Sequence, residues 1–318
     1  MPTHRRTVFP LVPKYRVTGL PLGGAASLRR GHGTDVAGSR AYVPGDPIST
    51  IDWRASARLS TAHARDEFVV RERYAEEAPR VVVLCDRRPS MSLYAAPFPW
   101  LRKPAAVRSV VELIVASAEA RNASVAYVDF AGAADRGGEP YWLPPAGRAA
   151  FTLIAERLDD GRFDAPADGI ARGLEFLARF RSELSSGTFV FVVSDFLGLE
   201  VPTSAWLTAA ARRWEVVPVV VQDPTWEQSF PLVDSIVLPL AQPDGPEVLD
   251  VRLSRAETKA RRAANESRLE MLLAGFASLG LDPVVVQSAD DSTVDRVFIG
   301  WASDRRGVRA TRELKAAR

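Results

Sequence analysis

From residue 79 onward, short β-branched runs alternate with longer amphipathic segments, and this alternation constrains the fold more than any other feature. "RVVVLC" (80–85) and "TFVFVVSD" (188–195) are apolar almost throughout, which is typical of strands buried on both faces of a sheet. "SVAYVDF" (124–130), "EVVPVVVQD" (215–223) and "DPVVVQ" (282–287) are further predicted strands. Strands that alternate with helices predict an α/β fold with a mostly parallel sheet covered by helices on both faces.

Amphipathic segments fill the intervals between these strands. In 104–122, apolar residues recur at intervals of three and four, so they share one face of a helix. Further helices are predicted at 147–158, 168–184, 203–214 and 254–279. The last of these begins with the capping box "SRAE" and is expected to end at Gly280. The turn-rich "AQPDGP" (241–246) predicts a hairpin, and "YWL" (141–143) an edge strand.

The first third of the chain does not follow this alternation. Residues 1–30 are rich in Pro, Gly and Arg and are expected to be extended or irregular. "YVPGDP" (42–47) predicts a turn, 51–60 one or two helical turns, and 62–74 an extended segment. We therefore divide the chain into three parts. Residues 1–78 form an N-terminal irregular and β appendage, residues 79–303 a sheet domain, and residues 304–318 a charged tail that we expect to be frayed.

Composition places the chain among ordinary globular proteins. It has 318 residues, 47% of them hydrophobic, and its single cysteine, Cys85, excludes an internal disulfide and favours a reducing compartment. No apolar run reaches the roughly 18 residues of a membrane span, and the start lacks the apolar core of a secretory signal. We expect a cytoplasmic protein without a membrane span.

Charge is distributed unevenly along the chain. Residues 1–65 carry ten Lys/Arg and three Asp/Glu, a balance of +7, and the last fifteen residues carry six and two, a balance of +4. Because the whole chain has a net charge of +2, the remainder must be −9. A basic arm of this kind can contact nucleic acid, anionic lipid or an acidic protein, or can simply be solvated. No recognised nucleic-acid motif accompanies it, so nucleic-acid binding is kept only as an alternative.

Carboxylates end two of the predicted strands. Open parallel sheets bind ligands beyond the carboxyl ends of their strands, where Asp86 and Asp195 lie. Together with Ser90 and Ser92 they offer oxygen ligands of the type that Mg²⁺ or Mn²⁺ prefers. The acid-rich loop 159–168 contains two further candidates, Asp164 and Asp168.

Arg88 opposes a metal at this place. A dication and a guanidinium about 5 Å apart repel each other by on the order of 6 kcal/mol at an effective dielectric near 20. An inward Arg88 would instead pair with Asp86 or Asp195 and supply the positive charge itself. We therefore expect no cofactor; the residues that would hold an ion, if one bound, are Asp86, Ser90 and Asp195.

The same residues could also form a catalytic site. Asp86 is placed like the nucleophile of aspartyl-phosphate enzymes, but the second acid usual two residues later is replaced by Arg88. His4, His32 and His63 are all N-terminal, and Cys85 is expected to be a buried strand residue. We expect no enzyme, with a hydrolase using Asp86 as the alternative.

A longer pattern resembles a known family. The segment "GTDVAGSRAYVPGDPISTIDWRASARLSTAHARDEFVVRERY" (33–74), followed by "VVVLCDRRPSMS" (81–92), resembles domain of unknown function 58. The matching positions are Arg40, Tyr42, Gly45, Asp46, Ile51, Asp52, Trp53, Ala57 and Arg58. From these residues alone, an acid–arginine network that clamps the appendage to the sheet domain is expected, and a docking face is the other interpretation.

The resemblance implies a fold and a partner. The second half of this family is similar to a von Willebrand factor A domain, whose metal-ion-dependent adhesion site follows the first strand as Asp-x-Ser-x-Ser. Asp86 and Ser90 match the first acid and the second serine, and Asp195 the late acid, whereas Arg88 stands at the first serine. The loop 159–168 has no threonine to complete the set. The resemblance thus implies a degenerate adhesion site at Asp86, Arg88, Ser90, Ser92 and Asp195.

Relatives are commonly encoded beside MoxR-type AAA+ ATPases. The resemblance therefore implies a non-catalytic protein-interaction module that works with such an ATPase in a chaperone-like or assembly role.

Overall fold

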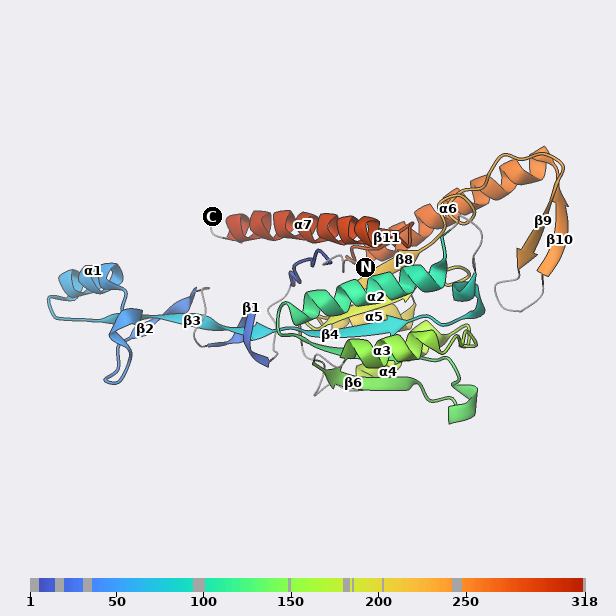
Figure 1. Ribbon diagram of the computed structural model, residues 1–318. Helices are drawn as coiled ribbons and strands as arrows, with labels where there is room; N and C mark the ends of the chain where they lie inside the picture. Colours follow the sequence, from blue (N-terminus) through green and yellow to red (C-terminus); the bar gives the residue numbers. More distant parts are fainter. Residues whose placement is uncertain are drawn as a thin grey trace.

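The computed structural model describes residues 6–14, 20–30, 36–93, 101–147, 150–179, 184, 186–201, 203–241 and 248–316. Its main body is a mixed α/β domain built on a six-stranded, mostly parallel sheet flanked by helices. A small antiparallel sheet precedes it and projects to one side as an arm (Figure 1). The predicted fold class is confirmed.

The central sheet has the strand order β11-β8-β7-β4-β5-β6. The strands are β4 (Arg80–Cys85), β5 (Ser124–Asp129), β6 (Tyr141–Ala146), β7 (Phe189–Ser194), β8 (Glu215–Val221) and β11 (Val284–Val286). All pairs are parallel except β5 with β6, which is antiparallel; β6 is the predicted edge strand. Because β5 and β7 flank β4 on opposite sides, strand order reverses at β4, the place where open α/β sheets bind ligands.

Six helices described in this body cover the two faces of the sheet. They are α2 (Lys103–Glu119), α3 (Ala150–Asp159), α4 (Gly169–Arg179), α5 (Ser204–Ala211), α6 (Arg255–Ser278) and α7 (Asp291–Ala316). One core joins α2, α3 and α7 to the face that carries Val81 and Val83, and a second joins α4, α5 and α6 to the face that carries Val82 and Leu84. The central strands β4, β5, β7 and β8 are thus buried on both sides, as their continuous apolar runs predict.

The N-terminal segment 6–14 lies along the first of these faces. Phe9 is buried, with its ring centroid 5.0 Å from that of Phe298 and 5.9 Å from that of Trp301, both in α7. Arg6 pairs with Asp295 at 2.7 Å. This segment therefore contributes to the core of the sheet domain, although the predicted appendage included it.

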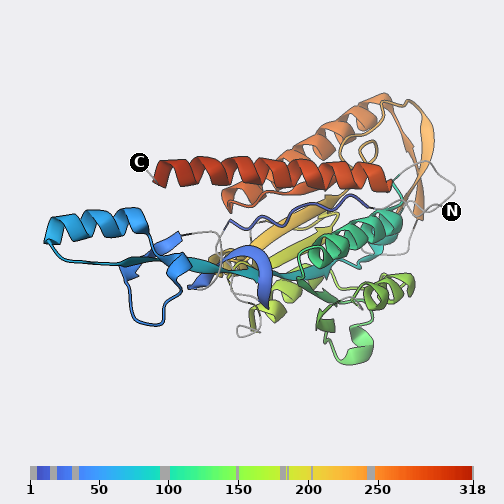
Figure 2. The same cartoon turned by 60° about the vertical axis from the view of Figure 1, so that its left-hand side comes forward.

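The arm consists of β1 (Leu20–Arg30), β2 (Val36–Ala41) and β3 (Val69–Ala78), with β3 in the middle, and of η1 (Ile48–Thr50) and α1 (Trp53–His63). The predicted turn is present: the N–H of Asp46 donates to the carbonyl of Val43 at 3.0 Å, and Gly45 has φ +110°. Helix α1 is longer than the one or two turns predicted. β3 runs almost directly into β4, which ties the arm to the sheet (Figures 1 and 2).

The C-terminal third confirms one group of predictions and corrects another. β9 (Ile236–Ala241) and β10 (Val248–Leu253) form the predicted hairpin, and the Ser254–Glu257 capping box opens α6. The predicted fraying beyond residue 304 is wrong, because α7 continues to Ala316. Arg305 explains the difference at the start of this stretch: it is buried and pairs with the buried carboxylate of Glu215.

Candidate functional site at the carboxyl edge of the sheet

Each of the four central parallel strands leads into an aspartate at its carboxyl end. Asp86 follows β4, Asp129 ends β5, Asp195 follows β7, and Asp223 lies just beyond β8. All four are buried. Carboxylates in such a place must be neutralised or hydrogen-bonded, because burying an unpaired charge is costly. The groups that neutralise them decide what this edge can do.

Arg88 joins the first and the third of these aspartates. Its Nη2 lies 2.9 Å from Oδ2 of Asp86 and 3.0 Å from Oδ1 of Asp195, and its Nη1 donates to the carbonyl of Leu197 at 2.9 Å. Asp86 also accepts from the Arg88 backbone at 2.9 Å and from Ser194 Oγ at 2.6 Å. The Arg88 side chain is only 3% exposed. Its guanidinium thus lies between the two carboxylates that were predicted as ion ligands.

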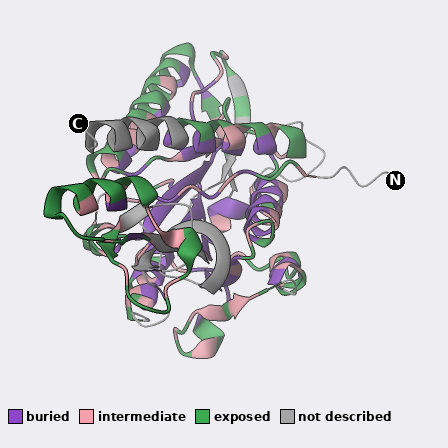
Figure 3. Cartoon of the chain, turned by 90° about the vertical axis from the view of Figure 1, so that its left-hand side faces the viewer, coloured by how far each residue is buried: buried purple, intermediate pink, exposed green. Residues whose placement is uncertain are grey.

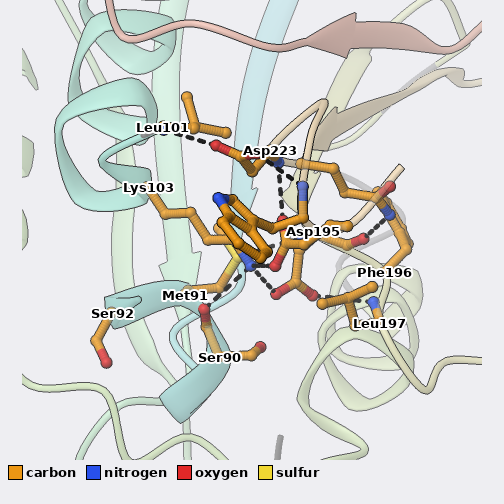
Figure 4. A network of polar contacts seen from close by, with 12 residues as sticks. Ser90, Met91, Ser92, Leu101, Lys103, Asp195, Phe196, Leu197 and Asp223 are labelled. Atoms are coloured by element: carbon orange, nitrogen blue, oxygen red, sulfur yellow. Dashed lines mark hydrogen bonds and ion pairs between the residues drawn. The ribbon is translucent and has the colours of Figure 1, made fainter. Parts of the chain in front are cut away.

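A second buried cation, Lys103, reaches the same cluster from the first turn of α2 (Figure 4). Its Nζ lies 2.8 Å from Oδ2 of Asp195 and 2.5 Å from Oε1 of Glu227, and it donates to the carbonyl of Ser90 at 3.2 Å. The side chain is 0% exposed. Sequence reasoning missed both Lys103 and Glu227. One signal was present: a lysine at a helix N-terminus opposes the helix dipole and therefore calls for acidic partners.

The mutual proximity of these charges fixes their protonation. Burial alone would raise the pKa of Asp195, but the Lys103 ammonium and the Arg88 guanidinium together bring it below its ordinary value. Burial alone would lower the pKa of Lys103, but Asp195 and Glu227 raise it. Glu227 has a raised pKa, because burial outweighs the attraction of Lys103. Asp195 and Lys103 are therefore an ion pair at neutral pH.

The serines of the predicted site separate. Ser90 is buried in the cluster, and its Oγ has no hydrogen-bond partner among the described residues. Ser92 is exposed and points away in Figure 4, with its hydroxyl donating to the carbonyl of Pro89 at 2.7 Å. The structure therefore brings together Asp86, Arg88, Ser90 and Asp195, and leaves Ser92 outside.

These residues do not fit a divalent cation. Both carboxylates that would ligate it already hold Arg88, and Asp195 holds Lys103 as well. Of the loop candidates, Asp164 accepts from the Gly132 backbone at 2.7 Å and Asp168 is exposed. Within the described ranges no group of three or more His, Cys, Asp or Glu residues is placed to hold a metal.

The other arginine of the motif, Arg87, turns to a different loop. Its Nη2 lies 2.6 Å from Oδ1 of Asp160, and it donates to the carbonyls of Arg157 and Arg162 at 3.0 and 2.9 Å. Arg157 in turn pairs with Asp129 at 2.6 Å. A second guanidinium network therefore neutralises the end of β5, and the two consecutive arginines brace two separate loops.

Cys85 takes no part in surface chemistry. The side chain is buried, and burial raises the pKa of its thiol to about 12. A thiol protonated at neutral pH is a poor nucleophile. The prediction that Cys85 is a buried strand residue is confirmed.

The family-motif residues lie in the arm and not at the carboxyl edge. Arg40 pairs with Asp46 at 2.6 Å, and Arg71 with Asp52 at 2.7 Å. The hydrogen bonds from Arg40 and from the Val43 backbone lower the pKa of Asp46 to about 2. The expected clamp onto the sheet domain is wrong, because these ion pairs close within the arm.

The remaining motif residues belong to the same end of the arm. Tyr42 packs edge-on against Phe68, and Ile51 forms an isolated antiparallel bridge with Val70. The other members, Trp53, Ala57 and Arg58, lie in α1 and are exposed.

Comparisons with known proteins place this chain in a group without an assigned activity. Residues 38–270 match the family described as "Protein of unknown function DUF58". No curated protein matches the chain.

Several solved structures are similar at low identity. The conserved hypothetical protein BatB from Bacteroides thetaiotaomicron has 15% identity and a TM-score of 0.40, with 72% of this chain and 99% of that one covered. The pilus adhesin SpaC from Lactobacillus rhamnosus GG has 14% identity and a TM-score of 0.41, with 71% and 30% covered. The PilB minor pilin from Streptococcus sanguinis has 10% identity and a TM-score of 0.37, with 77% and 65% covered. Among the described residues, no helix has the length and apolarity needed to cross a bilayer.

Proposed function

The chain belongs to the DUF58 family, and from this premise we propose that it is a non-catalytic protein-interaction module with a degenerate, von Willebrand factor A-like adhesion site. The observation that carries the proposal is the Arg88 guanidinium between Asp86 and Asp195. At this point of an α/β sheet a ligand or ion would bind, but here an internal cation satisfies both acids. The edge is then a braced scaffold whose exposed loops can contact another protein.

Burial of the cluster weighs against the hydrolase alternative. A nucleophilic Asp86 would have to meet a substrate, yet its carboxylate is enclosed by Arg88 and Ser194. The second acid that aspartyl-phosphate chemistry needs two residues later is Arg88 itself. Nothing at this edge of the described structure offers an exposed nucleophile with an adjacent base.

The partner we propose is a MoxR-type AAA+ ATPase, as the family resemblance implies, and the compartment a reducing cytoplasm, as the single reduced cysteine favours. Because Asp86, Arg88, Ser90 and Asp195 are all buried, they would act by holding the loops in place and not by touching the ATPase.

Two measurements test this proposal. Calorimetric titration with Mg²⁺ and with Mn²⁺ should give no saturable heat; micromolar binding that Asp195→Asn abolishes would overturn the degenerate-site interpretation. Biolayer interferometry against the purified ATPase encoded nearest to this chain's gene should give specific binding. Phosphatase turnover by the wild-type chain that disappears in Asp86→Asn would instead establish the hydrolase.

A further inference from the structure

Helix α1 is attached to the arm by its polar side. Asp52, Ser56 and Ser60 recur every four residues along one side. The N–H of Val69 donates to Ser56 Oγ at 2.9 Å, and the N–H of Glu67 donates to Ser60 Oγ at 2.9 Å. The backbone N–H of Asp52 donates to the carbonyl of Val69 at 2.8 Å. A surface helix normally buries its apolar stripe, so the packing of α1 is inverted.

The apolar residues around α1 face solvent instead. Ile48 is 69% exposed, Trp53 59%, Val43 56% and Phe68 44%. The Trp53 and Phe68 rings meet edge-on at 6.1 Å between centroids. We call the Trp53 and Phe68 pair the arm patch; it comes from the start of α1 and the residue before β3. Figure 3 colours most residues of α1 and of the neighbouring turn as exposed. Contiguous exposed apolar side chains mark interaction sites.

Charge beside the arm patch is unbalanced. Arg54 and Arg58 are exposed one turn apart on α1, and no ion pair joins either to an acid in the part of the chain that the structure describes. The nearby acids Asp46 and Asp52 are already held by arginines of the arm. A complementary surface would therefore combine an apolar pocket with carboxylates at its border. Trp and Arg are also the residues that most often dominate binding energy at protein interfaces.

The position of the arm patch favours a protein over a membrane. The turn that joins α1 to β3 lies farthest from the sheet domain (Figures 1 and 2), and its residues Ala64, Arg65 and Asp66 are exposed. A flat bilayer would meet this charged turn first. Trp53 lies at the start of α1, at the opposite end of the helix from this turn, where a shaped pocket can enclose it.

We propose that the arm patch, with Arg54 and Arg58 at its border, docks into an apolar pocket rimmed by carboxylates on a partner protein. This surface is separate from the carboxyl edge, so the chain would contact proteins in two places. The inference stands on the arm alone and does not require the partner to be the ATPase proposed above.

The experiment places a photo-crosslinking residue in the full chain, in the cells that make it. Ala57→p-benzoylphenylalanine puts the probe on the exposed side of α1, one turn from Trp53, and Leu207→p-benzoylphenylalanine on α5 is the matched exposed control. A protein crosslinked only from position 57 is then identified, purified and tested against the purified chain. We expect Trp53→Ala to weaken that binding at least tenfold and Leu207→Ala to change it less than twofold.

Charge is tested with the double variant Arg54→Glu, Arg58→Glu. We expect weaker binding, with the loss shrinking as salt is raised, because exposed charges are screened. Unchanged melting temperatures of the variants would show that the fold is intact, since these side chains are exposed.

The outcomes separate the two proposals. Three results overturn the arm proposal. The first is a set of crosslinked products that is the same from both positions, and the second is a probe at position 57 that captures only lipid or a second copy of this chain. The third is a crosslinked partner whose binding does not change with Trp53→Ala. A Trp53-dependent partner other than the ATPase supports the arm proposal, whatever the binding test with the ATPase gives. Binding of the ATPase that Trp53→Ala leaves unchanged supports the proposed ATPase partner, and the arm proposal is then decided by the protein crosslinked from position 57.

Discussion

Replacing Arg88 with methionine tests whether its guanidinium braces the carboxyl edge. The variant Arg88→Met keeps a similar apolar stem but leaves Asp86 and Asp195 without the cation that joins them. Removing one partner of a buried ion pair costs about 3–5 kcal/mol, because an uncompensated charge stays behind. Unfolding entropy of about 2.1 cal/mol/K per residue, over 318 residues, gives about 0.7 kcal/mol/K. The melting temperature should therefore fall by about 4–7 °C.

The pH dependence of this loss of stability tests whether Arg88 neutralises the buried acids. In the wild-type chain, Asp195 has a lowered pKa: burial opposes the shift, while Lys103 and Arg88 cause it. Its stabilising contribution is thus present above the unfolded pKa of about 3.9 and is lost as pH falls through the lower folded value. Without Arg88, burial still raises the folded pKa of Asp195 and only Lys103 is left to lower it, so the folded pKa moves upward and the variant loses less stability than the wild type as pH falls. The difference in stability between variant and wild type should therefore narrow as pH falls from neutral towards the unfolded pKa of about 3.9.

Thermal and urea unfolding measure both effects. Arg262→Met is the matched control: its ion pair with Glu266 on α6 is exposed on both sides, and exposed pairs contribute about 0–1 kcal/mol. If Arg88→Met were as stable as Arg262→Met, or if its deficit grew as pH fell, the guanidinium would not be neutralising these acids. Adding Asp86→Asn should recover part of the loss, since it removes one of the stranded charges.

Two further predictions concern packing and reactivity. Gly275→Ala in α6 should lower the free energy of unfolding by about 1–3 kcal/mol, because the added Cβ would lie 2.6 Å from the carbonyl oxygen of Val201. Gly300→Ala in α7 should raise it by about 0.5–1 kcal/mol, because the added Cβ meets open space. Equal changes in the free energy of urea unfolding for the two variants would contradict this packing. Cys85 should resist a thiol reagent at about pH 8 until the chain is unfolded, because it is buried with a pKa of about 12; rapid labelling of the native protein would disprove this.

Much of the sheet domain follows from local pattern. The continuous apolar runs of β4 and β7 demand cover on both faces, and the alternation with helices supplies that cover. The inward direction of Arg88 was predictable for the same reason. Strand ends in a parallel sheet share one edge, so a cation two residues from one buried acid and near another has its partners at hand.

The features that the sequence did not predict depend on contacts between residues far apart in the chain. Lys103 meets Glu227 across 124 positions of chain, and no local pattern shows that α2 begins beside the loop after β8. Arg305 was assigned to a fraying tail because the sequence alone does not reveal the buried Glu215 that receives it. The error in the arm has another cause. Asp46, Asp52 and Arg40 were identified from the sequence, but Arg71, which pairs with Asp52, was not, and these ion pairs close within the arm because a projecting arm has no core of the sheet domain beside it.

These contrasts bear on where recognition can occur. At the carboxyl edge, the two aspartates whose positions suggested a ligand site are buried and held by Arg88 and Lys103, so a partner would meet only the loops around them. In the arm, ion pairs and serine contacts fix the backbone while Trp53, Arg54 and Arg58 are left exposed. Exposed apolar and cationic groups on a polar-anchored helix contribute little to folding. Their contribution is therefore expected in binding, which makes the arm the more informative place to look for a partner.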